Sequence, residues 1–171
     1  MQIKENVGRL AQHVPTFGVK DCGRLVHEHF EKDQNNEGVV VMDGETPVGI
    51  IMRQDFYQKI GKQYGFSIYM NRPITLLMKE DFMKVDAGFE VAQISLLAMN
   101  RDNEHLYDFI IVEENGRFIG IVSIKYFLID LAKKREEETK RKLAQKMKKY
   151  GESIEDIMRE TGLSKDEIEK L

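Results

Sequence analysis

The chain has 171 residues, of which 42% are hydrophobic and 32% are charged, and its formal net charge at pH 7 is −3. This length and apolar content allow a globular core and exclude a disordered chain, and the single cysteine, Cys22, excludes an internal disulfide framework. No run of residues reaches membrane-spanning length and the first residues do not read as a secretion signal, so we expect a cytoplasmic protein that has no membrane partner.

Charge is distributed unevenly along the chain. Residues 1–132 carry 14 basic and 19 acidic side chains, residues 133–149 carry 9 and 3, and residues 150–171 carry 3 and 7. A basic segment therefore separates an acidic body from an acidic tail. Such a run is usually the solvated face of a helix, and a surface for nucleic acid or anionic lipid is the alternative.

The first half of the chain predicts a helix followed by a hairpin. Residues 7–20 are interrupted by a proline and a glycine, and we expect a short helix and then an extended segment there. Apolar residues at helical spacing predict a helix from Asp21 to Lys32, with Asp21 as its N-cap. Residues 39–51 read as two strands around an acidic turn that contains glycine, and a helix begins near Gln54.

The second half predicts the same elements in the same order. Residues 67–78 join the two halves, and a short strand is expected around residues 83–85. A helix follows over about residues 89–100. Its expected apolar face consists of Val91, Ile94, Leu97 and Ala98. A second hairpin over residues 109–122 and a helix from Ile124 complete this half.

The two hairpins are copies of one sequence phrase. Residues 39–56 and 109–127 each contain an apolar strand, an acidic turn, a second strand entered through Gly49 or Gly120, and the start of a helix. An internal duplication of this kind indicates one supersecondary unit that is used twice. We therefore predict an α+β fold of two β-α-β-β-α repeats packed sheet to sheet, followed by a long C-terminal helix and a helical hairpin.

This order of elements, with the two glycines 71 residues apart, resembles a tandem pair of CBS domains, also called a Bateman module. Residues 66–74 and 98–101 look like the CBS pairs that accompany GGDEF and EAL domains in bacterial signalling proteins, although neither catalytic domain fits in the rest of the chain. The boundaries that we expect are 7–66 for CBS repeat 1, 67–132 for CBS repeat 2, 133–150 for a basic helical linker and 151–171 for a helix-turn-helix-like tail.

The resemblance implies a ligand site after each glycine. CBS pairs commonly bind adenosine derivatives between the repeats through Gly-apolar-apolar-Thr/Ser-x-x-Asp, in which the hydroxyl meets a phosphate and the carboxylate accepts from the ribose. Both groups suit a helix start, where free backbone N–H groups also favour a phosphate. The first copy keeps Asp55 and has Met52 in place of the hydroxyl, whereas the second keeps Ser123 and has Tyr126 in place of the carboxylate.

The candidate ligand-binding residues are Gly49, Arg53, Asp55, Gly120, Ser123 and Lys125. The resemblance implies Asp55 at a ribose, Ser123 near a phosphate, and cationic charge from Arg53 and Lys125. The expected ligand is AMP, ADP, ATP or a related adenosine compound, and no cofactor is required. The alternative is that Asp55 and Ser123 serve only to cap helices.

Neither a metal site nor catalysis is expected. The four histidines and Cys22 show no spacing of metal ligands. No nucleophile with a base, glycine-rich phosphate loop or metalloprotease helix is present in the sequence.

The C-terminal region predicts one long helix and two short ones. The long helix runs from Leu128 to Tyr150, and its sparse apolar positions need a partner, either the body or a second subunit. Ser153 and Ser164 are placed as caps of two further helices, which resemble helix-turn-helix tails. The last helix carries more acidic than basic side chains, and this disfavours DNA binding.

Our main interpretation is a non-catalytic regulatory module that senses an adenosine-type nucleotide. We expect a homodimer formed through the CBS pair and the C-terminal helix, and an unknown downstream protein that responds to it. A DNA-binding regulator that uses the tail and a ligand-free dimerisation scaffold are the alternatives.

Overall fold

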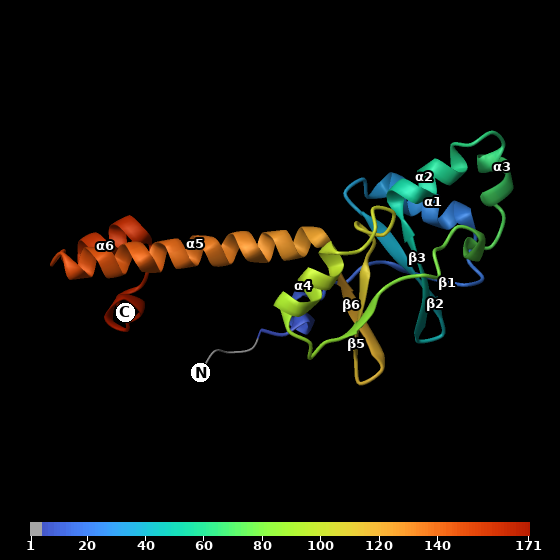
Figure 1. Ribbon diagram of the computed structural model, residues 1–171. Coiled ribbons are helices and arrows are strands. Elements are labelled where there is room, and N and C mark those ends of the chain that lie inside the picture. The colour runs from blue at the N-terminus through green and yellow to red at the C-terminus, as the bar shows by residue number, and fades with distance from the viewer. Residues whose placement is uncertain (1–4) are drawn as a thin grey trace. The chain divides into compact units, whose positions relative to one another are not determined.

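The computed structural model describes residues 5–171, and the chain divides into two compact units, Met1–Phe127 and Leu128–Leu171. The first unit contains the duplicated elements and the second contains most of the long helix and the tail (Figure 1). This is the expected α+β fold of two repeats, followed by a long helix and shorter helices.

Each repeat has the predicted order of strand, helix, two strands and helix. The first consists of β1 (Thr16–Gly18), α1 (Gly23–Lys32), β2 (Gly38–Asp43), β3 (Thr46–Met52) and α2 (Arg53–Ile60). The second consists of β4 (Lys84–Asp86), α4 (Val91–Met99), β5 (Ile110–Glu114), β6 (Arg117–Val122) and the start of α5 (Ile124–Lys149). Three short helices stand outside this order: η1 (Val7–Leu10), α3 (Gly65–Tyr69) and η2 (Ile74–Leu76).

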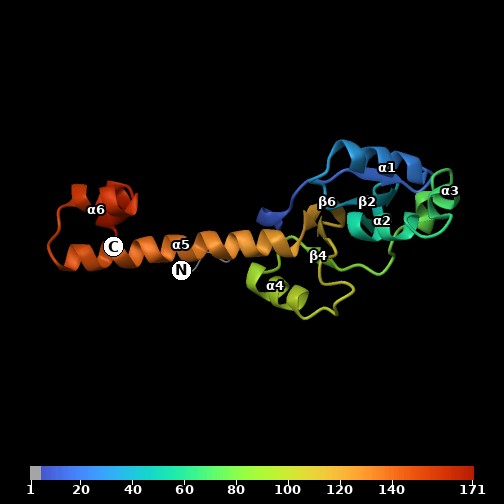
Figure 2. The same ribbon diagram turned by 90° about the horizontal axis from the view of Figure 1, so that it is seen from above.

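The duplication extends to the register of the sheets. Their strand orders are β1-β2-β3 and β4-β5-β6, and in each the first pair is parallel and the second antiparallel. Gly49 pairs with Val41 and Gly120 pairs with Val112, and each sheet has an irregularity in register directly after that valine. Figures 1 and 2 show the two sheets with α1, α2 and α3 beside the first and α4 beside the second.

The segments that precede β1 and β4 cross between the sheets. Gln12 exchanges two backbone hydrogen bonds with Ile121 of the second sheet, at 2.8 and 2.9 Å. Lys79 does the same with Ile50 of the first sheet, at 3.0 and 2.8 Å. Each connecting segment therefore pairs with β3 or β6 of the other repeat before it joins its own sheet.

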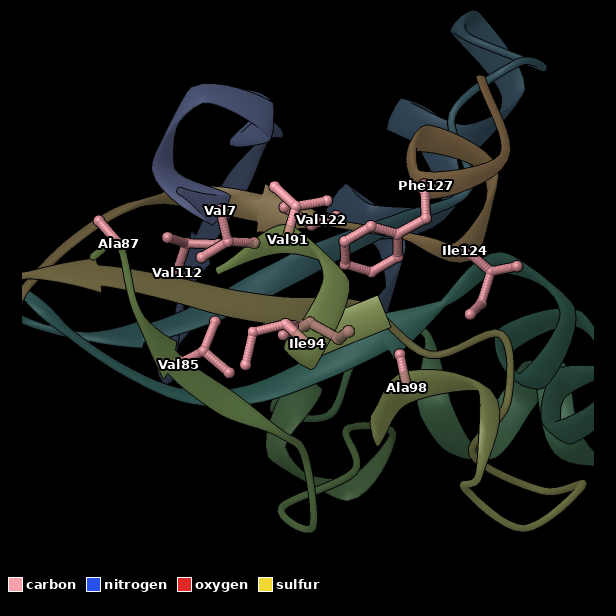
Figure 3. Packing of buried hydrophobic residues seen from close by; sticks show 11 residues of the cluster. Val7, Val85, Ala87, Val91, Ile94, Ala98, Val112, Val122, Ile124 and Phe127 are labelled. Carbon is pink, nitrogen blue, oxygen red and sulfur yellow. The ribbon is translucent and has the colours of Figure 1, made fainter. Parts of the chain in front are cut away.

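Three apolar clusters fill the first unit. One lies in each repeat, and Val7 packs in the cluster of the second repeat, together with Val85, Val91 and Phe127 (Figure 3). The third cluster joins the repeats. It is formed by Val14, Val40, Ile50, Met52, Phe109, Ile111 and Ile121. Because a fully buried Ile contributes about 1.5–3 kcal/mol, this shared cluster makes the two repeats one folding unit.

Two local expectations were wrong. The N-cap of α1 is Cys22, whereas the Asp21 carboxylate accepts a hydrogen bond from the Gly18 N–H at 2.7 Å and so closes the turn after β1. Leu97 is about half exposed, since the buried face of α4 is formed by Val91, Ile94 and Ala98.

The second unit is a small helical assembly. α6 (Ile154–Thr161) and α7 (Lys165–Glu169) bury Ile157 and Ile168 against Ala144 of α5. Ser153 caps α6, Ser164 forms the expected capping box of α7, and the turn between these helices contains Gly162 at φ 71°. Among residues 5–171, no helix has both the length and the apolar character needed to span a bilayer.

We expect Gly120→Ala to destabilise the first unit more than Gly49→Ala does. A Cβ at Gly120 lies 2.6 Å from the backbone oxygen of Gln12, at a φ of 154° that disfavours L side chains, and the paired backbone cannot move aside. The atoms nearest to a Cβ at Gly49 belong to the side chain of Met78, which can shift more readily than paired backbone.

Urea unfolding of both variants measures this difference. The loss in the free energy of unfolding should be about 2–4 kcal/mol for Gly120→Ala and about 1–2 kcal/mol for Gly49→Ala. Equal losses would contradict the importance of the pairing between Gln12 and Ile121.

Candidate functional site

Asp55, the carboxylate kept by the first copy, is engaged in an ion pair. It lies in the first turn of α2, and its Oδ2 is 2.8 Å from the Nζ of Lys79. The Asp55 side chain keeps 28% of its surface exposed, so its carboxylate faces both the lysine and solvent. Sequence reasoning missed Lys79, which lies in the segment that joins the repeats.

Lys79 connects Asp55 of the first repeat to Asp108 of the second. Its Nζ is 3.0 and 3.2 Å from the two carboxylate oxygens of Asp108 and also donates to the Glu104 carbonyl at 3.3 Å. The side chains are 17% exposed for Lys79 and 5% for Asp108. Burial alone would lower the pKa of Lys79, but the hydrogen bonds to Asp55 and Asp108 outweigh burial and raise it.

His105 completes this group. Its Nδ1 lies 2.9 Å from Oδ2 of Asp108, and its backbone N–H donates to Asp102 at 3.1 Å. The hydrogen bond with Asp108 raises the pKa of His105, although burial and Lys79 oppose the shift. We call Asp55, Lys79, His105 and Asp108 the ionic cluster. It joins the two repeats through charges that burial would otherwise disfavour.

A cavity of about 290 Å³ adjoins the ionic cluster. It is lined by Asp81, Phe82, Met83, Arg101, Asp102, His105 and Asp108. Phe82 and Met83 are half-buried and give the cavity an apolar side, whereas its three carboxylates give it an acidic side. Asp55 does not line the cavity. It pairs with Lys79, which in turn pairs with Asp108 in the cavity wall.

Arg53 is used within the first repeat. It donates to the carbonyls of Phe30 at 2.7 Å and Asp33 at 3.0 Å, where α1 ends. Its guanidinium also lies over the rings of Phe30 and Tyr57, at 5.2 and 5.1 Å from their centres. Arg53 therefore caps the C-terminus of α1 and packs on aromatic rings.

The residues of the second signature copy are buried, packed in the core or paired with other side chains. Ser123 is buried, and its Oγ has no hydrogen-bond partner within the described part of the chain. Tyr126, which replaces the carboxylate, packs against two apolar clusters. Lys125 is more than half exposed and pairs with Glu37 at 2.9 Å, a surface contact worth about 0–1 kcal/mol.

Gly49 and Gly120 permit close packing. A side chain at Gly49 would meet Met78, and one at Gly120 would meet the backbone of Gln12. Both positions lie next to the residues where the connecting segments pair, Ile50 and Ile121.

A larger cavity, of about 630 Å³, lies at the hairpin ends and contains none of the candidate residues. It is lined by Thr16, Phe17, Gly18, Met42, Gly44, Glu45, Arg117 and Phe118. All of these residues are half-buried or exposed, so the cavity contains no buried polar group that would orient a ligand. Over residues 5–171 there is also no group of three His, Cys, Asp or Glu side chains placed to hold a metal ion.

The comparisons with known proteins agree with this architecture. Residues 72–133 match the family model of the CBS domain. No curated protein sequence matches the chain.

Solved structures with CBS domains have the same fold. A CBS-domain protein from Agrobacterium tumefaciens superposes with a TM-score of 0.59 at 21% identity, over 73% of this chain and 98% of its own. A CBS domain pair/ACT domain protein from Thermotoga maritima gives 0.56 at 17% identity, over 75% and 97%. The structure of CBSX2 in complex with AMP gives 0.57 at 17% identity, over 76% and 98%. The first unit therefore has the fold of a CBS pair.

We expect Lys79→Met to destabilise the first unit by about 1–3 kcal/mol, because it leaves the buried Asp108 carboxylate without its ammonium partner. Lys84→Met is the matched control, since the pair of Lys84 with Glu113 is exposed, and it should change stability by less than about 1 kcal/mol. Urea unfolding of both variants measures this difference. Equal effects would show that the ionic cluster does not hold the repeats together.

We also expect a pH-dependent contribution from His105. Its pKa is higher in the folded protein than in the unfolded chain, so the stabilisation is complete below about pH 6.5 and is lost as the pH rises through the folded-state pKa. The stability deficit of His105→Gln relative to wild type should therefore be larger at about pH 6 than at about pH 8.5. Urea unfolding at both pH values measures it, and a deficit independent of pH would contradict the pairing with Asp108.

Proposed function

We propose that the protein is a non-catalytic regulatory module that binds an adenosine-type ligand between its two CBS repeats. The observation that carries this proposal is the cavity beside the ionic cluster. The residues that line the cavity all belong to the second repeat, and the ionic cluster connects them through Lys79 to Asp55 of the first repeat. A ligand there would change the contacts that connect the repeats, and this is what a sensor requires.

The chemistry of the cavity suits a nucleoside. Phe82 and Met83 offer apolar surface on which an adenine ring can pack. The carboxylates of Asp81, Asp102 and Asp108 can accept hydrogen bonds from ribose hydroxyls. The AMP complex of CBSX2 supports the choice of an adenosine compound for this fold.

In this proposal ligand binding changes the partner of the Asp55 carboxylate, which is now Lys79. This carboxylate accepts from Lys79 and does not line the cavity, so a ribose hydroxyl reaches Asp55 only if the ligand displaces that ammonium. Binding would then weaken the link from Asp55 to Asp108 and loosen one repeat from the other. We propose secondary roles for Lys125 and Arg53, which a ligand must first free from Glu37 and from the end of α1, and for Ser123, whose buried Oγ has no hydrogen-bond partner in the described part of the chain.

The same proposal includes the location, the oligomeric state and the partner of the protein. We propose a cytoplasmic homodimer that passes the change to a downstream protein through α5 and the C-terminal helices. The proposed dimer contact rests on the half-exposed apolar side chains Leu128, Ile129 and Leu131 in the first turns of the second unit.

A thermal-shift screen tests ligand binding. At about 100 times its Kd, a ligand that binds only the folded state adds about 2.7 kcal/mol of stability, which should raise the Tm by several degrees. Adenosine, AMP, ADP, ATP and S-adenosylmethionine are the test compounds, with guanosine and GMP as controls.

Asp108→Asn and Phe82→Ala should reduce the shift, whereas Asp43→Asn in the first hairpin should leave it unchanged. If no adenosine compound raises the Tm of ligand-free protein, the sensor proposal is wrong and a dimerisation scaffold remains.

A further inference from the structure

We propose that the cavity beside the ionic cluster selects adenosine derivatives that carry no phosphate, either neutral or cationic ones. This inference rests on the proposed function and narrows its ligand class. It follows from the charges around the cavity, from the existing partners of the nearby cations, and from the size of the cavity.

The charges around the cavity sum to a negative value. Three carboxylates line the wall, those of Asp81, Asp102 and Asp108, and the lining cations are Arg101 and, only when it is protonated, His105. Outside the lining, Lys79 lies between Asp55 and Asp108, and Lys59 interacts with Asp55 but donates to the Leu77 carbonyl at 2.9 Å. A phosphate monoester, which carries nearly two negative charges at neutral pH, would enter a region of its own sign.

Neither cation is placed to reverse this sign. The ammonium of Lys79 lies between the carboxylates of Asp55 and Asp108 and is held within about 3 Å of both. Arg101 donates from Nε to the Ala98 carbonyl at 3.1 Å, and from one terminal nitrogen to the carbonyls of Leu106 and Asp108 at 3.0 and 3.1 Å. Both cations therefore hold the wall together, and a phosphate that binds Lys79 or the bonded nitrogens of Arg101 must compete with these contacts.

The cations predicted from sequence also have other partners. Arg53 is bound at the end of α1, and Lys125 is paired with Glu37. Neither of them lines the cavity. The two basic residues of the signature segments thus supply no phosphate-binding charge to this site.

Size favours the same ligand class. Small-molecule sites usually enclose about 300–1,000 Å³, so a cavity of about 290 Å³ is just below this range. It accommodates a nucleoside more readily than a nucleoside with a triphosphate chain. The half-buried Phe82 and Met83 occupy part of the wall, where a base gains apolar contact.

Isothermal titration of the full chain with adenosine, S-adenosylmethionine, AMP and ATP tests the inference, with ATP measured both with and without Mg²⁺. We expect adenosine and S-adenosylmethionine to bind about tenfold or more tightly than AMP and ATP. Added salt should tighten AMP binding and weaken that of S-adenosylmethionine, because screening reduces repulsion in one case and attraction in the other.

A double variant, Asp81→Asn with Asp102→Asn, should lower the ratio of the Kd of AMP to that of adenosine by about threefold to tenfold. Both residues are exposed, so their replacement leaves the core unchanged, and the amide introduced at position 102 would still offer an oxygen to the N–H of His105. Glu28→Gln, on the exposed side of α1, is the matched control for loss of an acidic charge and should leave the ratio unchanged.

Tighter binding of AMP or ATP than of adenosine would overturn the inference and leave the proposed function in place. So would a Kd ratio that the double variant does not change. Failure of all four compounds to bind would instead overturn the proposed function, and the inference with it.

Discussion

The backbone pairings of Lys79 with Ile50 and of Gln12 with Ile121 determine how the first unit is built. Each places a connecting segment of one repeat against β3 or β6 of the other, and both isoleucines are fully buried in the cluster that the sheets share. The small Gly49 and Gly120 next to them admit this close approach. Each repeat therefore adds a backbone pairing and part of the shared core to the other.

The same pairing positions the candidate site. Because its backbone is fixed against Ile50, Lys79 can reach Asp55 in one repeat and Asp108 in the other. The charges are partly or largely buried and satisfy one another, so a ligand must offer equivalent hydrogen bonds to replace any of them. In the function that we propose, ligand binding and contact between the repeats would therefore involve the same atoms.

The sequence predicted the fold well because local signals repeat in it. Apolar strands, Gly-containing turns and the helix caps at Ser153 and Ser164 are encoded in neighbouring residues. The strands and turns recur around Gly49 and Gly120, and this indicates two copies of one unit. The site was harder to predict from the sequence, because Lys79 and Phe82 gain their roles from residues far along the chain, and no motif marks the local pair of His105 and Asp108. One signal was available: the acidic residues Glu37 and Asp108 are 71 residues apart, the same separation as Gly49 and Gly120, and so stand at equivalent places in the two copies.

The position of the ligand is tested most directly by a titration with adenosine that is followed through the backbone amide resonances. If the ligand occupies the cavity beside the ionic cluster, the largest shifts should fall on Phe82, Met83, Asp102 and Asp108, with smaller ones at Asp55. Shifts that concentrate around the hairpin-end residues Gly44 and Arg117, or within residues 151–171, would contradict a ligand site between the repeats.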